Sequence, residues 1–310
     1  MIRGLSFVIE PARAGERLDR FLSDALPTTS RALIERALER EGIRLNSRTV
    51  RKGQRLREDD RLEVLELMEQ SDWRAAPNPS PPFRVLLEDA AFVVLEKPSG
   101  QPVHPLDPDE TGTTVNALLA AYPETAHVGP DRLFPAIVHR LDTETSGVLL
   151  AARDETAYRH LRGQFERHTV EKKYLALVAG VVRGSGRMEH VLSHADGPEH
   201  RMLASAPGAT PRGRRPMRAV TEYTVRRAAG NATLLDIVIR TGVTHQIRCQ
   251  LAAGGHPILG DALYGGVSEG YAGRLFLHAA AIRFRHPRTN EPVCVESPLP
   301  EDLATVLKTV

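Results

Sequence analysis

The chain is expected to form an α+β or mixed α/β fold, because short strands and short amphipathic helices follow one another along most of it. Its 310 residues fit about two domains. A proline-rich stretch interrupts the pattern once and marks a boundary. We therefore predict a domain at residues 1–70, a linker at 71–83 and a larger domain at 84–310.

Two helices open the smaller domain. Leu18, Phe21 and Leu22 share one face of the first helix. The second helix is predicted over residues 31–41, with Ser30 as its N-cap. Both helices therefore present an apolar face to a common core.

Short strands follow the helices. Residues 43–45 and 61–65 alternate apolar and polar side chains, and Asn46-Ser47 is a typical turn. In the linker, four prolines between residues 77 and 82 favour extended geometry over regular structure.

Positive charge is concentrated in one part of the smaller domain, residues 31–61. Between residues 31 and 61, ten basic side chains stand against six acidic ones, a local +4, whereas the whole chain carries only +2. A salt-bridged, solvated surface and a phosphate-binding face both fit this composition. The candidate phosphate contacts are Arg31, Arg36, Arg44 and Arg48.

The larger domain mixes strands with helices. Residues 92–95 and 174–178 are predicted to form buried strands. Thr113 or Thr114 can cap one helix, and Asp154 can cap another.

Further along, residues 183–218 are rich in Gly, Pro and Arg and are predicted to be a long irregular stretch. A strand is predicted at 235–239, followed by a helix with Thr244 as its N-cap and Gly254-Gly255 as its stop.

Several functional classes lack their signals. No apolar run approaches the roughly 18 residues of a membrane span, and the first residues have no signal-peptide pattern. Cys249 and Cys294 form no metal-binding or redox pair, which fits a reduced, cytoplasmic setting. Nucleotide-binding glycine motifs, the G-x-S-x-G motif and metal-ligand histidine spacings are absent.

The chemistry is expected at residues 138–147, which lead into an apolar strand at 148–152. A carboxylate in a turn before a buried strand is held by a fixed backbone and can point outward. Asp142 occupies that position; the plainer alternative is that it only caps a turn.

Several ordered motifs carry a family resemblance. The sequence H-R-L-D-x-x-T-S-G is complete at 139–147, and K-x-Y-x-A-x-V-x-G occurs within 171–180. Residues 241–248 read T-G-V-T-H-Q-I-R, close to T-G-R-T-H-Q-I-R. With shorter matches at 97–100 and 257–261, residues 85–303 resemble the catalytic domain of the RluA-type pseudouridine synthases.

The smaller domain carries a second resemblance. Its sequence at 17–22, 30–31, 42–46 and 59–64 resembles the RNA-binding module of ribosomal protein S-four. The two resemblances together imply an α+β protein: an S-four-like RNA-binding domain followed by a mixed, largely antiparallel catalytic sheet.

The resemblance implies that Asp142, Tyr174 and Arg248 are catalytic. Pseudouridine formation breaks a bond between uracil nitrogen and the anomeric carbon and rejoins the sugar to a uracil carbon. Because no redox change or net hydrolysis occurs, no cofactor or metal is expected. Asp142 can attack the anomeric carbon or remove a neighbouring sugar proton, and both routes stay open.

The neighbouring roles are assigned in the same way. Arg248 is expected to pair with Asp142, with a bidentate geometry that only arginine allows. Tyr174 is expected to stack against the flipped uracil. Arg140 is expected to fill the gap left by the base; a phosphate contact or a loop salt bridge is the alternative.

The expected partner is RNA, with large-subunit ribosomal RNA ahead of transfer RNA, and the expected state is a monomer. A non-catalytic RNA-binding or ribosome-assembly protein on the same fold is the alternative from another class. One departure bears on it: Val243 stands where the family usually has Arg, with Arg240 and Arg274 as candidates to compensate.

Overall fold

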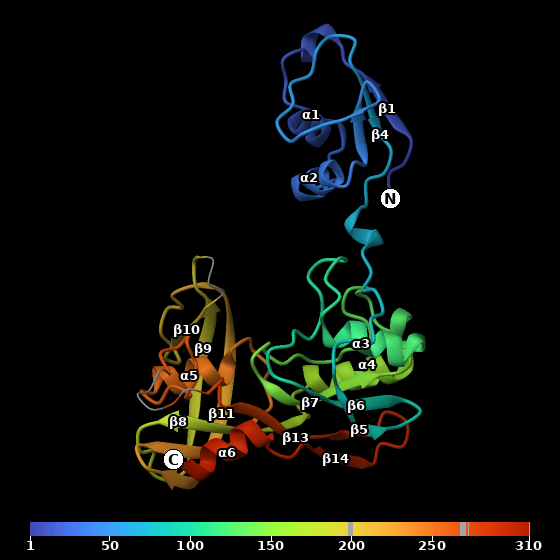
Figure 1. Ribbon diagram of the computed structural model, residues 1–310. Helices are drawn as coiled ribbons and strands as arrows, with labels where there is room; N and C mark the ends of the chain where they lie inside the picture. Colours follow the sequence, from blue (N-terminus) through green and yellow to red (C-terminus); the bar gives the residue numbers. More distant parts are fainter. Residues whose placement is uncertain (198–200, 267–270, 272, 310) are drawn as a thin grey trace. The chain divides into compact units, whose positions relative to one another are not determined.

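The structure is a computed structural model that describes residues 1–197, 201–266, 271 and 273–309 (Figure 1). The chain divides into two compact units, Met1–Arg74 and Ala75–Val310. Each unit has its own hydrophobic core.

The first unit is a four-stranded antiparallel sheet with two helices. As the sequence predicts, Leu18, Phe21 and Leu22 are buried on one face of the first helix. In order of pairing, the strands are β1 (Leu5–Val8), β4 (Arg61–Val64), β2 (Ile43–Leu45) and β3 (Arg48–Thr49); the helices are α1 (Leu18–Ala25) and α2 (Arg31–Glu39), with 3-10 turns η1 (Pro11–Arg13) and η2 (Gln70–Asp72).

Helix α2 is shorter than predicted. It follows Ser30 as expected, although the Ser30 side chain makes no capping hydrogen bond, and it ends at Glu39. Glu41 adopts a left-handed backbone with φ 57°, which stops the helix. Gly42 then passes so close to the Glu66 carbonyl that a Cβ would lie 2.2 Å from its oxygen. The chain therefore turns directly into β2.

The proline-rich segment is fastened to the second unit from Ala75 onward. The Ala75 amide donates to the Arg132 carbonyl at 2.9 Å, and the Asn116 side-chain amide donates to the Ala76 carbonyl at 2.6 Å. Strand β5 begins only at Arg84. Contacts thus divide the chain after Arg74, while domain limits at residues 70 and 84 stay predictions.

The second unit is built on one large mixed sheet. Every pairing is antiparallel except the short parallel contact between β7 and β13, so the α+β prediction is confirmed. In order of pairing, the strands are β10 (Met202–Ser205), β9 (Gly186–His194), β11 (Arg214–Ala229), β12 (Ala232–Ile239), β8 (Glu171–Ala179), β13 (Leu277–Arg285), β7 (Ser146–Ala152), β6 (Phe92–Lys97) and β5 (Arg84–Glu88), with β14 (Pro292–Glu296) paired to β13.

The prediction of an irregular stretch at 183–218 is wrong, apart from residues 198–200, which lie outside the described residues. It contains β9, β10 and the start of β11. The periodic signal is weak because these strands cover only a small apolar cluster around Leu192 and Met202. Pairing with distant partners, and not local pattern, makes them strands.

Helices cover both halves of this sheet on one side. Figure 1 shows α3 and α4 near β6 and β7, whereas α5 lies beside β9 and β10. Thr113 and Asp154 accept capping hydrogen bonds, as predicted, but α5 begins one residue later than predicted, after His245. The helices are α3 (Thr114–Ala121), α4 (Glu155–Glu166), α5 (Gln246–Ala253) and α6 (Glu301–Thr309), with the 3-10 turn η3 (Pro123–His127).

Gly147 is required where β7 meets β13. Its φ is 117°, a conformation that L-residues rarely adopt, and a Cβ would lie 2.2 Å from the Ala279 carbonyl oxygen. The parallel contact that joins the two halves of the sheet therefore depends on the absence of a side chain at this position.

We predict that Gly147→Ala lowers the free energy of unfolding by about 3 kcal/mol, because backbone strain adds to the steric clash. Gly184→Ala is the matched control: its φ is also positive, at 73°, but nothing lies near its Cβ. That variant should lose about 1 kcal/mol. Unfolding in denaturant is followed by far-UV circular dichroism. Fluorescence of Trp73, the only tryptophan, would report on the first unit and not on the second, which contains Gly147. Equal losses would contradict the steric argument.

Candidate active site

A cleft of about 590 Å³ in the second unit brings together the three residues predicted to be catalytic. Asp142 comes from the turn before β7, Tyr174 from β8 and Arg248 from α5. Arg140 also lines this cleft. The predicted RNA contacts Arg31, Arg36, Arg44 and Arg48 lie in the first unit.

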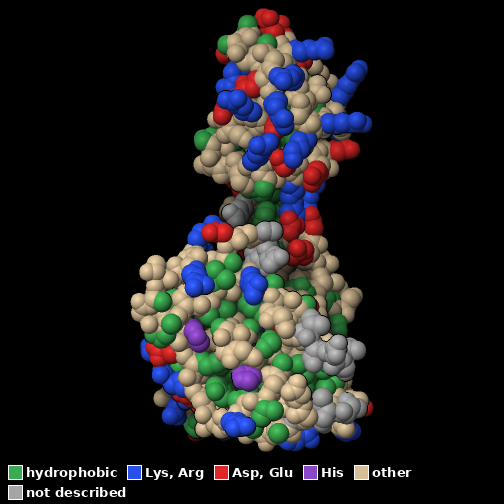
Figure 2. Space-filling view, turned by 90° about the vertical axis from the view of Figure 1, so that its left-hand side faces the viewer, with side chains coloured by type: hydrophobic (Ala, Val, Ile, Leu, Met, Phe, Trp, Pro, Cys, Tyr) green, Lys and Arg blue, Asp and Glu red, His purple; other side chains and the backbone are tan. Residues whose placement is uncertain are grey.

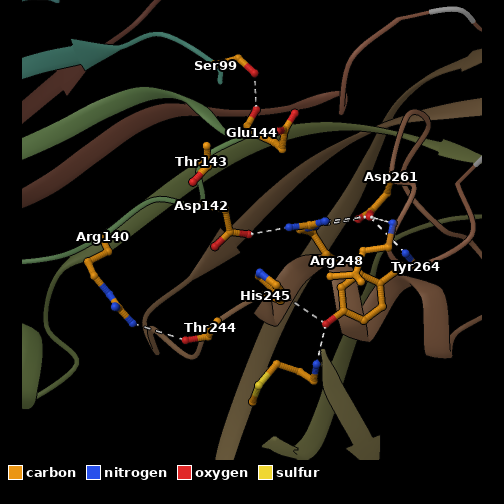
Figure 3. Close-up of polar contacts among 12 residues, drawn as sticks. Ser99, Arg140, Asp142, Thr143, Glu144, Thr244, His245, Arg248, Asp261 and Tyr264 are labelled. Atoms are coloured by element: carbon orange, nitrogen blue, oxygen red, sulfur yellow. Dashed lines mark hydrogen bonds and ion pairs between the residues drawn. The ribbon is translucent and has the colours of Figure 1, made fainter. Parts of the chain in front are cut away.

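Arg248 lies between two carboxylates, as Figure 3 shows. Its Nη1 donates to Asp142 Oδ2 at 3.3 Å. Its Nε and Nη2 donate to the two carboxylate oxygens of Asp261 at 2.7 and 2.8 Å. The expectation of a bidentate pair with Asp142 is therefore wrong. The bidentate partner of Arg248 is Asp261, and Asp142 accepts a single hydrogen bond, from Nη1.

Burial makes this arrangement obligatory. The side chains of Arg248 and Asp261 are 8% and 0% exposed, whereas that of Asp142 is 24% exposed at the cleft. Burial alone would lower the pKa of Arg248, but the hydrogen bonds and charge of Asp261, with a further contribution from Asp142, raise it. The guanidinium stays charged, and removing a buried partner of such a charge costs about 3–5 kcal/mol.

The backbone of the Asp142 turn is tied to the loop after β6. Lys97 is fully buried, and its ammonium donates to the carbonyls of Thr143, Gln101 and Pro98 at 2.7–3.0 Å. Burial lowers the pKa of Lys97 to about 7, opposed by the charge of Asp142. Three carbonyl acceptors match the three protons of an ammonium group, and so support its charged form.

Two further bonds complete the tie. Ser99 Oγ donates to the Glu144 carbonyl at 2.6 Å, and the Gly100 amide donates to the Thr143 carbonyl at 2.9 Å (Figure 3 shows the first). The turn is thus held on its far side, while the Asp142 carboxylate faces the cleft.

Tyr174 is held in the middle of the sheet, opposite Ile237 of β12 and Ala279 of β13. Tyr174 is 7% exposed, and it lines the cleft. Burial, with the nearby charge of Asp142, raises the pKa of Tyr174 well above its ordinary value. The phenol therefore keeps its proton at neutral pH.

His139 supports the sheet. Its Nε2 accepts a hydrogen bond from the Leu150 amide at 2.9 Å, and its ring stacks on Phe165 with centroids 5.0 Å apart. Burial lowers the pKa of His139 to about 3, so the ring is neutral. It occupies a hydrogen-bonding position that β7 would otherwise leave open.

The departure at Val243 is accommodated by packing. The Gln246 side chain holds the loop, accepting from the Val243 amide at 3.2 Å and from Thr241 Oγ1 at 2.9 Å. The Val243 side chain packs against the apolar cluster that contains Met202 and Tyr264. No additional charge is needed to hold this loop.

The two arginines considered as substitutes differ in position. Arg240 lines the cleft and pairs with Glu171 and Glu222 at 3.1 and 3.4 Å. Arg274 does not line it: it pairs with Asp302 at 2.6 Å and donates to Ser146. Of the two, only Arg240 could contact a ligand bound in the cleft.

Arg140 is exposed at the mouth of the cleft. Its Nη2 lies 3.5 Å from Thr244 Oγ1, so a weak contact links the Asp142 turn to the loop before α5 (Figure 3). No ion pair of Arg140 occurs among the described residues, and it can therefore move to a ligand at little cost.

The basic residues of the first unit fall into two kinds. Arg31 pairs with Asp19 at 3.0 Å and with Glu35 at 3.1 Å, and the Arg36 guanidinium lies 5.5 Å from the centroid of the Trp73 ring. In the β2–β3 hairpin, Arg44 and Arg48 are exposed and have no ion pair within the described part of the chain. Figure 2 shows Lys and Arg side chains gathered on the visible face of this unit.

Sequence reasoning missed Asp261, Lys97, His245 and Tyr264 as parts of the site. Asp261 and Lys97 lie inside motifs that carried the family resemblance, which was a usable signal. Tyr264 had none, because its contact with His245 joins segments that are adjacent only in the fold.

Two negative findings apply to the described ranges only. No group of three or more His, Cys, Asp or Glu side chains there is arranged to hold a metal ion. No helix there has both the length and the apolarity to cross a membrane.

Comparisons with known proteins agree with this geometry. Residues 91–253 match the RNA pseudouridylate synthase family. An uncharacterized RNA pseudouridine synthase of Chloroflexus aurantiacus is 37% identical, over 97% of this chain and 92% of the relative. A solved structure of human RNA Pseudouridylate Synthase Domain Containing 4 has a TM-score of 0.57 at 25% identity, over 73% of this chain and 92% of that one.

Two named relatives are similar over nearly their whole length. Ribosomal large subunit pseudouridine synthase D of Xanthomonas campestris is 33% identical, over 97% of this chain and 90% of the relative. Ribosomal large subunit pseudouridine synthase C of Vibrio vulnificus is 32% identical, over 97% and 95%. The chain belongs to the RNA pseudouridylate synthase family. It is an RNA pseudouridine synthase, an isomerase that acts on RNA.

We predict that Asp261→Asn lowers the single-turnover rate about 10²-fold, because Arg248 loses its anionic partner and the cleft loses its geometry. RNA affinity should change by only a few fold. Asp236→Asn is the control, since it removes an exposed partner of Arg226 outside the cleft. Rapid-quench kinetics on a uridine-containing RNA gives the rate; wild-type turnover in Asp261→Asn would show that Arg248 needs no such anchor.

Proposed function

We propose that this enzyme converts specific uridines of large-subunit ribosomal RNA to pseudouridine. Support comes from the near full-length similarity to the Xanthomonas and Vibrio relatives, whose names refer to the large ribosomal subunit. The first unit, Met1–Arg74, is part of that shared length, and the local excess of basic residues at 31–61 within it suits structured RNA. Such a substrate implies work in the cytoplasm.

Asp142 is proposed to act on the ribose. The carrying observation is its position: a partly exposed carboxylate beside a buried guanidinium that holds only one of its oxygens. Among the described residues, Oδ1 of Asp142 accepts no hydrogen bond, so that oxygen is available to substrate. It can attack the anomeric carbon or remove a neighbouring sugar proton, and in either route the Arg248 guanidinium holds the other oxygen.

The base has to leave its stack before Asp142 can reach the sugar. Extrusion costs a few kcal/mol. We propose that Tyr174, held rigidly in β8, stacks against the uracil, an interaction that contributes about 1–3 kcal/mol. Arg140, exposed at the mouth of the cleft and weakly held by Thr244, is proposed to fill the gap left by the base.

The first unit is proposed to position the RNA through its hairpin arginines. Arg44 and Arg48 are the proposed phosphate contacts with charges that no described carboxylate neutralises. Arg31 and Arg36 are proposed as flanking contacts, although protein groups already occupy part of their guanidinium surface.

Mapping of pseudouridines in total RNA tests the function. We predict that cells without the gene lose particular sites in large-subunit ribosomal RNA. Wild-type protein should restore them, and Asp142→Asn should not, although its RNA affinity should stay within a few fold. Lost sites confined to transfer RNA would reject the proposed substrate. Restoration by Asp142→Asn would reject the role of its carboxylate.

A second prediction concerns salt. Affinity falls as salt rises, and each phosphate contact removed should make the slope of log affinity against log salt shallower by about 1. The double variant Arg44→Ala/Arg48→Ala should therefore make it shallower by about 2. Arg3→Gln/Glu66→Gln is the control, because it removes an exposed ion pair of the same unit without changing net charge. Filter binding at several salt concentrations measures the slope. An unchanged slope would mean that the hairpin does not contact RNA.

A further inference from the structure

His245 adopts a backbone conformation that is uncommon for residues other than glycine. It precedes α5 with φ 52° and ψ 22°, in the left-handed region. Strained non-glycine residues are concentrated at functional sites. This one lines the cleft, and Figure 3 shows its ring between Asp142 and Tyr264. The mechanism above gives this residue no task.

Contacts with Tyr264 determine which ring nitrogen of His245 carries the proton. The Tyr264 hydroxyl accepts a hydrogen bond from the Met202 amide at 2.8 Å and lies 3.1 Å from His245 Nδ1. Burial raises the pKa of Tyr264, so the hydroxyl keeps its proton. Among the described residues, Nδ1 is the only acceptor for that proton. Nδ1 is therefore the acceptor, and the ring proton is on Nε2.

The ring is also neutral. Burial lowers the pKa of His245, and the charge of Asp142 opposes this only in part. A neutral ring with its proton on Nε2 has no basic nitrogen left at that position, so it cannot accept a proton there. It can only donate a hydrogen bond. No described protein group accepts from Nε2, and a ligand in the cleft can do so.

The reaction creates a charge that such a donor can stabilise. When the bond between the anomeric carbon and uracil N1 breaks, its electron pair stays on the base. The resulting negative charge is shared with the two carbonyl oxygens of uracil. Asp142 acts on the sugar to which this base is attached, and its charge is felt at His245. His245, Asp142 and Tyr174 line the same cleft, so a donor on His245 is available to a base bound there.

We propose that His245 is a further catalytic residue, whose Nε2–H donates a hydrogen bond to a carbonyl oxygen of the departing uracil. The proposal rests on the function proposed above. His245 keeps its proton throughout, so the step needs no additional acid, base or oxidant. Tyr264 is the positioning residue, because its hydroxyl holds the ring in the required tautomer.

The test combines protein and substrate changes. A short RNA carrying one uridine that the wild-type enzyme converts is prepared with uridine, 2-thiouridine or 4-thiouridine at that position. Sulfur accepts hydrogen bonds more weakly than oxygen. Single-turnover rates and RNA affinities are measured for wild type, His245→Phe and His245→Asn. Asn adopts the left-handed conformation more readily than most residues, so His245→Asn preserves the backbone if His245→Phe fails to fold.

We expect His245→Phe to lower the rate 10²–10³-fold, as for loss of one donor to a developing anion, with affinity within a few fold of wild type. One of the two thio substitutions should lower the single-turnover rate of the wild type by a larger factor than it lowers the rate of either His245 variant. The variants have already lost the contact with that oxygen. If both thio substitutions slow wild type and variants by the same factor, the proposal is overturned. If large-subunit ribosomal RNA is not the substrate, the mapping of pseudouridines in total RNA will show it, independently of this test.

Discussion

The buried guanidinium of Arg248 is the interaction on which the site depends. It joins the turn before β7, helix α5 and the segment after it, three parts of the chain that meet only in the folded second unit. A buried charge is tolerated only when it is fully paired. Asp261 supplies most of that pairing, and this leaves Asp142 partly exposed and held through a single oxygen. The same contact thus stabilises the fold and holds a carboxylate at the cleft.

Around this pair, the backbone is held by further side-chain and backbone contacts. Lys97 fastens the Asp142 turn through the Thr143 carbonyl, and Gly147 allows β7 to approach β13. Gln246 fixes the loop before α5, so an apolar residue at 243 is accommodated by packing. Rigid support of this kind keeps the reacting groups in place without contacting the substrate. His245 is held by the same means, through Tyr264.

Local pattern predicted most elements of the fold but not all. The buried face of α1 and the caps at Thr113 and Asp154 follow from periodicity and hydrogen-bonding side chains, which act over a few residues. Strands β9 and β10 were not predicted, because they contain few apolar side chains to give a periodic signal. Pairing with distant parts of the chain stabilises them instead. Helix α2 ended early because Glu41 adopts a left-handed backbone, and Gly42 then packs against the carbonyl of Glu66, which is distant in the sequence.

The sequence by itself determined the class of chemistry, because the ordered motifs around Asp142, Tyr174 and Arg248 are local strings that can be compared directly. It also determined the α+β architecture and the local excess of basic residues at 31–61. Only the tertiary structure decided which carboxylate binds Arg248 in bidentate fashion and which ring nitrogen of His245 lies against the Tyr264 hydroxyl. Both depend on distances between side chains that are far apart in the chain, and one-dimensional spacing does not contain those distances.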